Sequence, residues 1–375
     1  MRTRFARLCL CLLAPLFFSC GCDRVPFDRG TATASKDDWP CYGSMGGRGA
    51  GISLIAIRPD RPGNKTPYEP YMATAGAPLF PTDVHACGIF LGGTVNLWGR
   101  PNEGLELLST FVPHGAYDLC FTADGKCLAY SCREGVLIWH IDERRFETRL
   151  PASDGATFAL SADGRWVARC DHVEDGSDEV RVTVLDLEKT EPRGGFVFRS
   201  DRRLDCHISS DGARLSTVAY RREPAETKAV VFNLDTGAEE LAVPVDRNLR
   251  GSAWSRSGRV FATASWNDAV VQIWDMAKGE LRSTAGMQSK IWCVIISPDE
   301  RLVLTGGEGT KGNDAAGEVV VWEAATGREL ARIWDESSWG VTALAMTDEG
   351  MLLIGNGNGY ISVRRIPERI LAQAR

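Results

Sequence analysis

The sequence lacks the short motifs by which metal-dependent and hydrolytic enzymes are usually recognised. Its 12 cysteines and 5 histidines include no Cys-x-x-Cys or His-x-x-x-His pair, and such pairs are the common signature of a zinc site. It also has no Gly-x-Ser-x-Gly sequence, the turn that presents the nucleophile of many serine hydrolases. We therefore expect no metal and no cofactor, and we expect that the protein is not an enzyme.

Concentrated charge of one sign is also missing. The chain has 43 Lys and Arg residues against 49 Asp and Glu residues, a net charge of −6, and no long block of like charge. Surfaces that bind nucleic acid or anionic membranes need clusters of positive charge. The composition therefore argues against nucleic acid as a partner.

Long apolar runs are limited to one segment near the N-terminus. Leu8–Phe18 is apolar and follows three arginines, Arg2, Arg4 and Arg7. A helix needs about 20 apolar residues to cross a bilayer, so this run is too short to span one. A basic start, a short apolar run and a small-residue cleavage site together predict that residues 1–22 form a signal peptide.

The cysteines at the end of this segment point to an anchor. The position of Cys20 resembles that of the lipid-modified cysteine of bacterial lipoproteins, and Cys22 is the alternative acceptor. Phe17 departs from the leucine usual in that family. The resemblance implies a protein exported to the cell envelope and held there by an N-terminal lipid, on its periplasmic or extracellular face. An ordinary secretory peptide is the alternative.

Export would allow disulfides, although connectivity cannot be deduced from the sequence. Cys41–Cys87 and Cys132–Cys170 are candidate pairs. Other cysteines, such as Cys120, Cys206 and Cys293, fall in predicted inner strands and are expected to be buried small apolar residues.

Helical periodicity is scarce, and only residues 367–375 predict a short terminal helix. Residues 23–51 are expected to form a tether and a segment packed on the domain. Over residues 52–366 a unit of about 45 residues recurs seven times. Each unit begins with a short apolar strand, a tight turn and a second strand, and Gly with Asp or Ser gives these turns the character of hairpins. The turns lie at Pro59-Asp60, Ala123–Gly125, Ala162–Gly164, Ser210–Gly212, Arg256–Gly258, Pro298–Glu300 and Asp348–Gly350.

A third strand in each unit ends at an equivalent position, and four of these positions are tryptophans. They are Trp98, Trp139, Leu185, Phe232, Trp274, Trp322 and Arg364. Four short strands in about 45 residues is the size of one propeller blade. We therefore predict an all-β fold, a seven-bladed β-propeller of four-stranded antiparallel blades. Bulky residues before the turns should fill the core between blades: Phe121, Leu160, Ile208, Trp254 and Ile296.

The seventh unit has no clear outer strand after Tyr360–Ile366. Either the segment near residues 25–50 or the C-terminal tail must cover the remaining edge. An exposed strand edge invites aggregation, and we favour the N-terminal segment.

The best-preserved unit resembles the WD-repeat β-propeller family. Val271-Gln272-Ile273-Trp274-Asp275 is similar to the strand that gives the family its name, and Asp268 sits at the family's turn aspartate. The Gly-His start of the family is missing, with Gly286-Met287 in its place, so the family's His–Asp bond is expected to be absent. Thr236-Gly237 and Thr326-Gly327 are similar to pyrroloquinoline-quinone-like propellers, which remain the rival family.

The resemblance implies a non-catalytic scaffold, expected to be monomeric, that binds a protein or peptide partner. Binding should involve the face that carries the loops before each inner strand and between the second and third strands. Aromatic and Arg residues are the usual anchors of protein contacts. The candidates near the starts of inner strands are Tyr117, Arg250, Trp292 and Trp339.

Two other functions stay open. A propeller enzyme of the quinoprotein or lactonase type would need polar residues in the central channel, where Asp118, Asp205 and His207 are candidates. A carbohydrate- or cell-wall-binding propeller would need only tryptophans on the rim. Gly307-x-Gly309-x-x-Gly312 matches a dinucleotide fingerprint but should join two strands rather than a strand and a helix. The acidic stretch 171–179 does not follow the order of a calcium loop.

Overall fold

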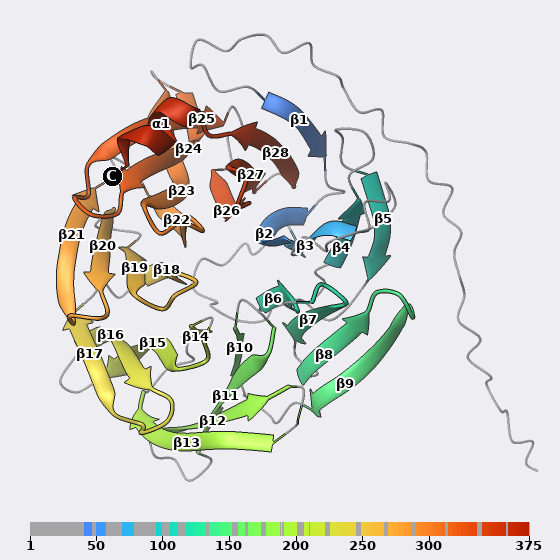
Figure 1. The fold of residues 1–375 in the computed structure, drawn as a ribbon, viewed down its shortest axis with the longest axis vertical. Helices are drawn as coiled ribbons and strands as arrows, with labels where there is room; N and C mark the ends of the chain where they lie inside the picture. The colour runs from blue at the N-terminus through green and yellow to red at the C-terminus, as the bar shows by residue number, and fades with distance from the viewer. Residues whose placement is uncertain are drawn as a thin grey trace, which may run out of the picture.

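Four-stranded antiparallel sheets are arranged in a ring around a central axis (Figure 1). The computed structural model describes five strands between residues 41 and 111, and residues 118–374 except 123, 133–134, 152–156, 162–163, 174–177, 188, 190, 201–205, 210, 222–225, 245–248, 266–268, 287–289, 312–313, 336–339 and 358. The ring confirms the predicted all-β propeller of four-stranded antiparallel blades.

Six of the sheets are each made of four strands that are consecutive in the chain. The first two are β2 (Ala50–Ile57), β3 (Pro70–Pro78), β4 (Val95–Gly99) and β5 (Glu106–Phe111), then β6 (Asp118–Phe121), β7 (Cys127–Cys132), β8 (Gly135–His140) and β9 (Arg145–Pro151). The next two are β10 (Thr157–Leu160), β11 (Trp166–His172), β12 (Glu179–Asp186) and β13 (Glu191–Arg199), then β14 (Cys206–Ile208), β15 (Arg214–Arg221), β16 (Glu226–Asn233) and β17 (Glu239–Pro244). The last two are β18 (Leu249–Trp254), β19 (Val260–Ser265), β20 (Val270–Asp275) and β21 (Glu280–Gly286), then β22 (Ile291–Ile296), β23 (Leu302–Lys311), β24 (Asp314–Glu323) and β25 (Glu329–Asp335).

The remaining sheet is composite, and here the expectation of seven equivalent units is corrected. Only six blades are contiguous in sequence, because the chain turns into helix α1 (Glu368–Gln373) soon after its last strand. The strands β26 (Val341–Met346), β27 (Met351–Asn356) and β28 (Tyr360–Arg365) become a four-stranded sheet only by adding β1 (Cys41–Gly46). β1 pairs antiparallel with β28, with Ser44 opposite Ser362. The N-terminal segment therefore covers this edge, as predicted.

The first strand of each sheet lies nearest the axis (Figure 1). These inner strands contact one another in the order β2, β6, β10, β14, β18, β22, β26 and back to β2. Apolar residues fill the spaces between the sheets. Phe121, Leu160 and Ile208 are buried as predicted, while Trp254 and Ile296 are partly buried.

Several turns between first and second strands share one hydrogen-bond pattern. A buried serine directly follows the inner strand, and its Oγ accepts the backbone N–H of the residue five positions later, as in Ser161 to Trp166, Ser209 to Arg214 and Ser297 to Leu302, all at 2.9 Å. The glycines of these turns have positive φ, for example 66° at Gly212. This is the hairpin chemistry predicted from the sequence, because glycine adopts positive φ without strain.

The seven aligned third-strand positions are structurally equivalent. Each faces an apolar residue of the second strand: Met72–Trp98, Leu128–Trp139, Val167–Leu185, Leu215–Phe232, Phe261–Trp274, Val303–Trp322 and Leu352–Arg364. This match confirms the repeat alignment. The predicted terminal helix is also present as α1, whose Ile370 is buried.

Candidate interaction face

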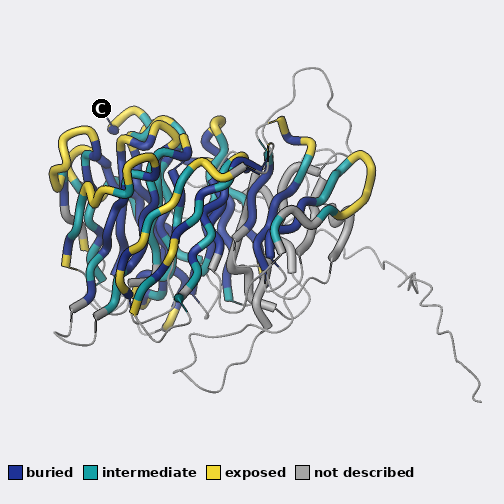
Figure 2. Tube along the Cα trace, turned by 90° about the horizontal axis from the view of Figure 1, so that it is seen from below, coloured by how far each residue is buried: buried dark blue, intermediate teal, exposed yellow. Residues whose placement is uncertain are grey.

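The ring has two faces that differ in the kind of connection they carry. Successive strands run in opposite directions, so the turns between first and second strands and between third and fourth strands lie at one end of each sheet. We call this end the turn face. The loops that join one sheet to the next and the second strand to the third lie at the other end, which we call the loop face. Figure 2 shows the described exposed turns gathered on one side of the ring.

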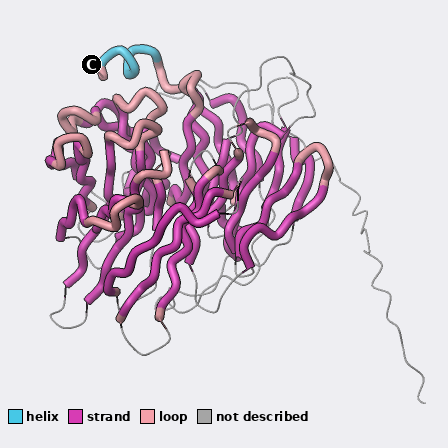
Figure 3. Tube along the Cα trace, turned by 60° about the horizontal axis from the view of Figure 1, so that its bottom comes forward, coloured by secondary structure: helices cyan, strands magenta, loops and turns pink. Residues whose placement is uncertain are grey.

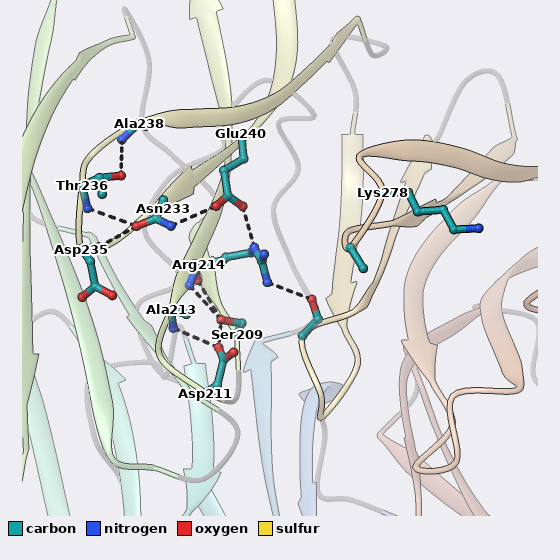
Figure 4. A network of polar contacts seen from close by, with 12 residues as sticks. Ser209, Asp211, Ala213, Arg214, Asn233, Asp235, Thr236, Ala238, Glu240 and Lys278 are labelled. Atoms are coloured by element: carbon teal, nitrogen blue, oxygen red, sulfur yellow. Dashed lines mark hydrogen bonds and ion pairs between the residues drawn. The ribbon is translucent and has the colours of Figure 1, made fainter.

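The turn face is held together by ion pairs and hydrogen bonds between neighbouring sheets. Arg214 binds Glu240 at 2.6 Å within its own sheet and reaches the carbonyl oxygen of Gly258 in the next sheet at 3.4 Å (Figure 4). Asn233 donates to the same Glu240 carboxylate at 3.0 Å. Because these polar groups are satisfied by one another, their evident role is structural.

A second tie on this face is built around an indole ring. The guanidinium groups of Arg165 and Arg193 each lie 4.8 Å from the centroid of Trp166. Arg193 also donates to the carbonyl oxygen of Gly212 at 2.8 Å and forms two bonds with Asp235 in the next sheet. The tie therefore joins two sheets through cation–π and charge-assisted contacts.

The loop face has a different feature, a set of β-bulges at one end of the inner strands. The pairing register shifts between Ile52 and Leu54 in β2, between Leu249 and Gly251 in β18, between Ile291 and Cys293 in β22, and between Val341 and Ala343 in β26. The residues at the shifts are Ser53, Arg250, Trp292 and Thr342. Among the described residues, the pairing of β6, β10 and β14 has no such shift.

The four bulges are neighbours in space. β18 contacts β22, β22 contacts β26, and β26 contacts β2. They form an arc on one side of the ring axis, which we call the bulge arc (Ser53, Arg250, Trp292 and Thr342). A bulge re-aims a side chain and is common beside functional sites. The fold therefore sets the four positions apart from the regular pairing around them.

Trp292 is the member of the bulge arc whose surroundings are best described. Its side chain is half-buried, and its indole nitrogen lies 3.5 Å from the point that a Cβ on Gly340 would occupy. Beside it, the Lys290 ammonium and the Glu308 carboxylate lie 3.6 Å apart. An aromatic ring next to an exposed ion pair has the composition of a protein-contact anchor.

A long hairpin stands beside Trp292. β23 and β24 contain 10 residues each and pair along their whole length, from Leu302–Glu323 to Lys311–Asp314. Figure 3 shows how strands make up the wall of the ring along its full depth. Buried Glu318 on β24 is neutralised by Arg332 of β25, which also binds Glu329 at 2.8 Å. The hairpin is thus fixed near its middle by an ion pair.

Two glycines of the dinucleotide fingerprint, Gly307 and Gly309, lie in this hairpin and have a packing explanation. A Cβ on Gly307 would lie 1.9 Å from the carbonyl oxygen of Lys290, and one on Gly309 would lie 2.8 Å from the Trp334 ring. Close approach of strands and rings therefore requires glycine. Because β23 pairs with a strand rather than leading into a helix, the segment lacks the strand–helix geometry of a dinucleotide site.

The other predicted partner-binding residues are placed less completely. Arg250 lies in β18 at its bulge, but its side chain is outside the described residues, as are Tyr117 and Trp339. Cys20 and Cys22, the predicted lipid acceptors, are outside them too. Sequence reasoning picked out two members of the bulge arc and missed Ser53 and Thr342, because small polar residues carry no anchor signal by themselves.

The predicted structural repeat residues have distinct environments. The indole N–H of Trp322 donates to Thr305 at 3.0 Å, whereas that of Trp274 is buried without a hydrogen-bond partner among the described residues. Asp275 binds Arg282 at 2.7 Å, and the hydrogen bond from Arg282 holds the pKa of its carboxyl below the usual range. Trp139 packs on Phe146 with ring centroids 4.4 Å apart. Trp98 is placed by its strand pairing, and Asp268 is outside the described residues.

The described residues do not show the three channel-enzyme candidates, Asp118, Asp205 and His207, grouped together. His207 occupies the middle of β14 opposite Ser216. Asp118 begins β6, but its side chain and the whole of Asp205 fall outside the described residues. In the described part of the chain, no three His, Cys, Asp or Glu side chains are grouped as metal ligands, and no helix there has the length and apolar character of a membrane span.

Comparison with known proteins supports the repeat assignment. The family described as WD domain, G-beta repeat, matches residues 279–311, which run from the turn before β21 through β22 to the end of β23. A search of curated proteins found no match. WD40 propellers commonly bind protein partners and usually act as scaffolds rather than enzymes. The repeat match and the ring of four-stranded blades together support a β-propeller that contains a WD-type repeat.

Proposed function

We propose that this protein is a non-catalytic scaffold that binds a protein or peptide on its loop face, across the bulge arc. The observation that carries the proposal is the run of four neighbouring inner strands that each bulge at the same end. We count the composite sheet as a seventh blade of the ring, so that the arc spans adjacent blades of a closed scaffold.

The loop face is better suited to binding a partner than the turn face. The described turn-face charges are largely used in ion pairs, such as Arg193–Asp235 between two sheets and Arg214–Glu240 within one sheet. Such groups would have to give up existing partners to bind a new one, which costs free energy. Trp292, by contrast, is a partly exposed aromatic side chain beside an exposed ion pair.

The proposal is tested by comparing which proteins bind to two variants. Arg250→Ala/Trp292→Ala changes the bulge arc, and Arg256→Ala/Asp348→Ala removes an exposed ion pair, with side chains 61% and 66% exposed, from the turn face. Partners recovered by affinity purification from membrane extracts should be lost with the first variant and retained with the second. Circular dichroism establishes that both variants are folded. Retention of the full partner set by the first variant would refute the loop-face assignment.

We also propose that the chain is exported and anchored by a lipid on Cys20, with Cys22 as the alternative. The support is the sequence pattern of residues 1–22. Cys20→Ala should move the protein from the membrane fraction to the soluble fraction after cell fractionation. Unchanged retention in Cys20→Ala and in Cys20→Ala/Cys22→Ala would contradict the anchor.

A further inference from the structure

A cysteine, a histidine and a glutamate lie in line across three adjacent strands of one sheet. The Sγ atom of Cys127 on β7 is 3.4 Å from Nδ1 of His140 on β8. The other ring nitrogen of His140, Nε2, is 2.9 Å from a carboxylate oxygen of Glu147 on β9. Cys127 and His140 are direct partners in the strand pairing. Both lie at the turn-face end of their strands, away from the bulge arc.

The Glu147 carboxylate determines which ring nitrogen of His140 carries the proton. An ionised carboxylate only accepts hydrogen bonds, so Nε2 of His140 must carry the proton that Glu147 accepts. In the neutral ring Nδ1 then has a free lone pair, and this lone pair faces the Cys127 thiol. The histidine is therefore oriented to accept the thiol proton, in the manner of a nucleophile–base–carboxylate arrangement.

Charged side chains surround the pair. A guanidinium nitrogen of Arg145 lies 3.6 Å from a carboxylate oxygen of Glu147. Glu143 completes the group through its ion pair with Arg145 and its weaker interaction with His140. A nearby guanidinium and a protonated imidazole both stabilise a cysteine thiolate.

Cys127 is also more accessible to solvent than Cys120 and Cys132 of the same sheet. Its side chain is partly exposed, and those of His140 and Glu147 are 18% and 30% exposed. Cys120 and Cys132 of the same sheet are buried. Cys293 is the other described cysteine with partial exposure, but burial of its thiol raises its pKa to about 12. Reactivity of a cysteine depends on both thiolate character and access.

We propose that Cys127 is a nucleophilic thiol that exchanges with external disulfides, with His140 as its base and Glu147 as the residue that positions His140. The Cys127 proton passes to Nδ1 of His140, and the thiolate attacks one sulfur of the external disulfide. A bond from Cys127 to that sulfur forms as the old sulfur–sulfur bond breaks. The departing thiolate takes the proton from His140, so one thiol and one disulfide become a mixed disulfide and a new thiol.

The test uses oxidised glutathione as the external disulfide and the purified full chain. Mass spectrometry of peptides measures the rate of mixed-disulfide formation at each cysteine over a range of pH. In the wild type, Cys127 should react ahead of Cys120, Cys132 and Cys293. His140→Phe should slow the reaction at neutral pH by on the order of tenfold and move the pH profile to more alkaline values.

A second pair of variants separates positioning from a merely structural effect. Glu147→Gln should slow the reaction at neutral pH less than His140→Phe does, and Glu147→Asp should recover part of the rate. The control Glu280→Gln removes the same charge from the outer strand β21 of a different sheet and should react like the wild type. His140→Gln replaces His140→Phe if the latter fails to fold. An unchanged rate and pH profile in the folded His140 variant would overturn the proposal.

Discussion

Single side chains decide the geometry of the turns on which this ring is built. The turn at Pro298–Glu300 lacks the glycine of its companions, and Glu300 itself adopts a φ of 62°. Its carboxylate accepts the backbone N–H of Ser257 from the neighbouring sheet at 2.9 Å. A strained backbone is tolerated here because the side chain makes a contact that glycine could not make.

Acid sensitivity should follow from the turn aspartates, of which Asp299 is the clearest case. Burial raises the pKa of Asp299, but hydrogen bonds from Ser297 and Arg301 outweigh it and hold the pKa below its usual range. Such a group stabilises the folded state above its unfolded pKa of about 3.9, and this stabilisation is lost as the pH falls through the folded pKa. Asp299→Asn should therefore unfold at a lower temperature near neutral pH and lose less stability on acidification than the wild type.

Thermal unfolding followed by circular dichroism between about pH 7 and pH 3 measures this difference. The exposed Asp348, which pairs with Arg256 at 2.7 Å, provides a matched control as Asp348→Asn. Parallel pH curves for the wild type and Asp299→Asn would show that Asp299 has no such role.

Gly307→Ala should destabilise the fold. The added Cβ would lie 1.9 Å from the Lys290 carbonyl oxygen, so backbone must move, at a cost of roughly 2 kcal/mol or more. Gly286→Ala is the control, because the nearest atom to its added Cβ is 3.8 Å away. Urea unfolding measures the stability of both variants, and equal stabilities would contradict the packing explanation.

Because this segment lacks the geometry of a dinucleotide site, addition of NAD should leave the unfolding midpoint of the wild type unchanged.

At the scale of strands, the contacts between neighbouring sheets matter as much as pairing within a sheet. Cys170 of β11 lies opposite Thr157 within its own sheet, yet its Sγ is 3.3 Å from Sγ of Cys206 at the start of β14 in the next sheet. Both thiols are buried and free. The candidate pair Cys132–Cys170 is thus not the pairing that the fold favours, because Cys206 is the thiol next to Cys170.

Oxidation should join β11 and β14 through a Cys170–Cys206 disulfide. Incubation with oxidised glutathione would convert the two thiols into one bridge and release two reduced glutathione molecules. The bridge closes a loop of 36 residues, for which about 3–4 kcal/mol of stabilisation is typical. The oxidised protein should therefore unfold at a higher temperature.

Peptide mapping identifies the bridge, and calorimetry measures the shift. Cys206→Ser should abolish both, while Cys132→Ser should leave both intact. A stable oxidised protein whose Cys170 remains a free thiol would contradict the expected link.

Local patterns predicted the strands, the turns and the ring, because these depend on residues close together in the chain. Buried Ser209 and positive-φ Gly212 are three residues apart, and their roles follow from residue type. The bulges and the Cys127–His140–Glu147 line could not be predicted in the same way. They depend on the register between strands, and Cys127 and His140 are 13 residues apart with nothing in the intervening sequence to specify their contact.

At the scale of the whole molecule, stability depends on closing the ring between β1 and β28. An uncovered β28 would present unpaired backbone groups, which promote association of chains. Deletion of residues 23–46, which contain β1, should lower the unfolding temperature and produce oligomers in size-exclusion chromatography. Deletion of residues 23–37 alone keeps β1 and should leave a monomer of wild-type stability. A stable monomer after the longer deletion would show that β1 is dispensable.

The seam between β1 and β28 also has a consequence for the order in which the protein is made. Synthesis proceeds from the N-terminus, so β1 is made long before β28, and Ser44 cannot meet Ser362 until synthesis has passed that residue. Contacts so distant in sequence form slowly. Every premature stop before Tyr360–Arg365 leaves β1 without its partner strand. The seam between β1 and β28 therefore forms only in chains that extend through Arg365.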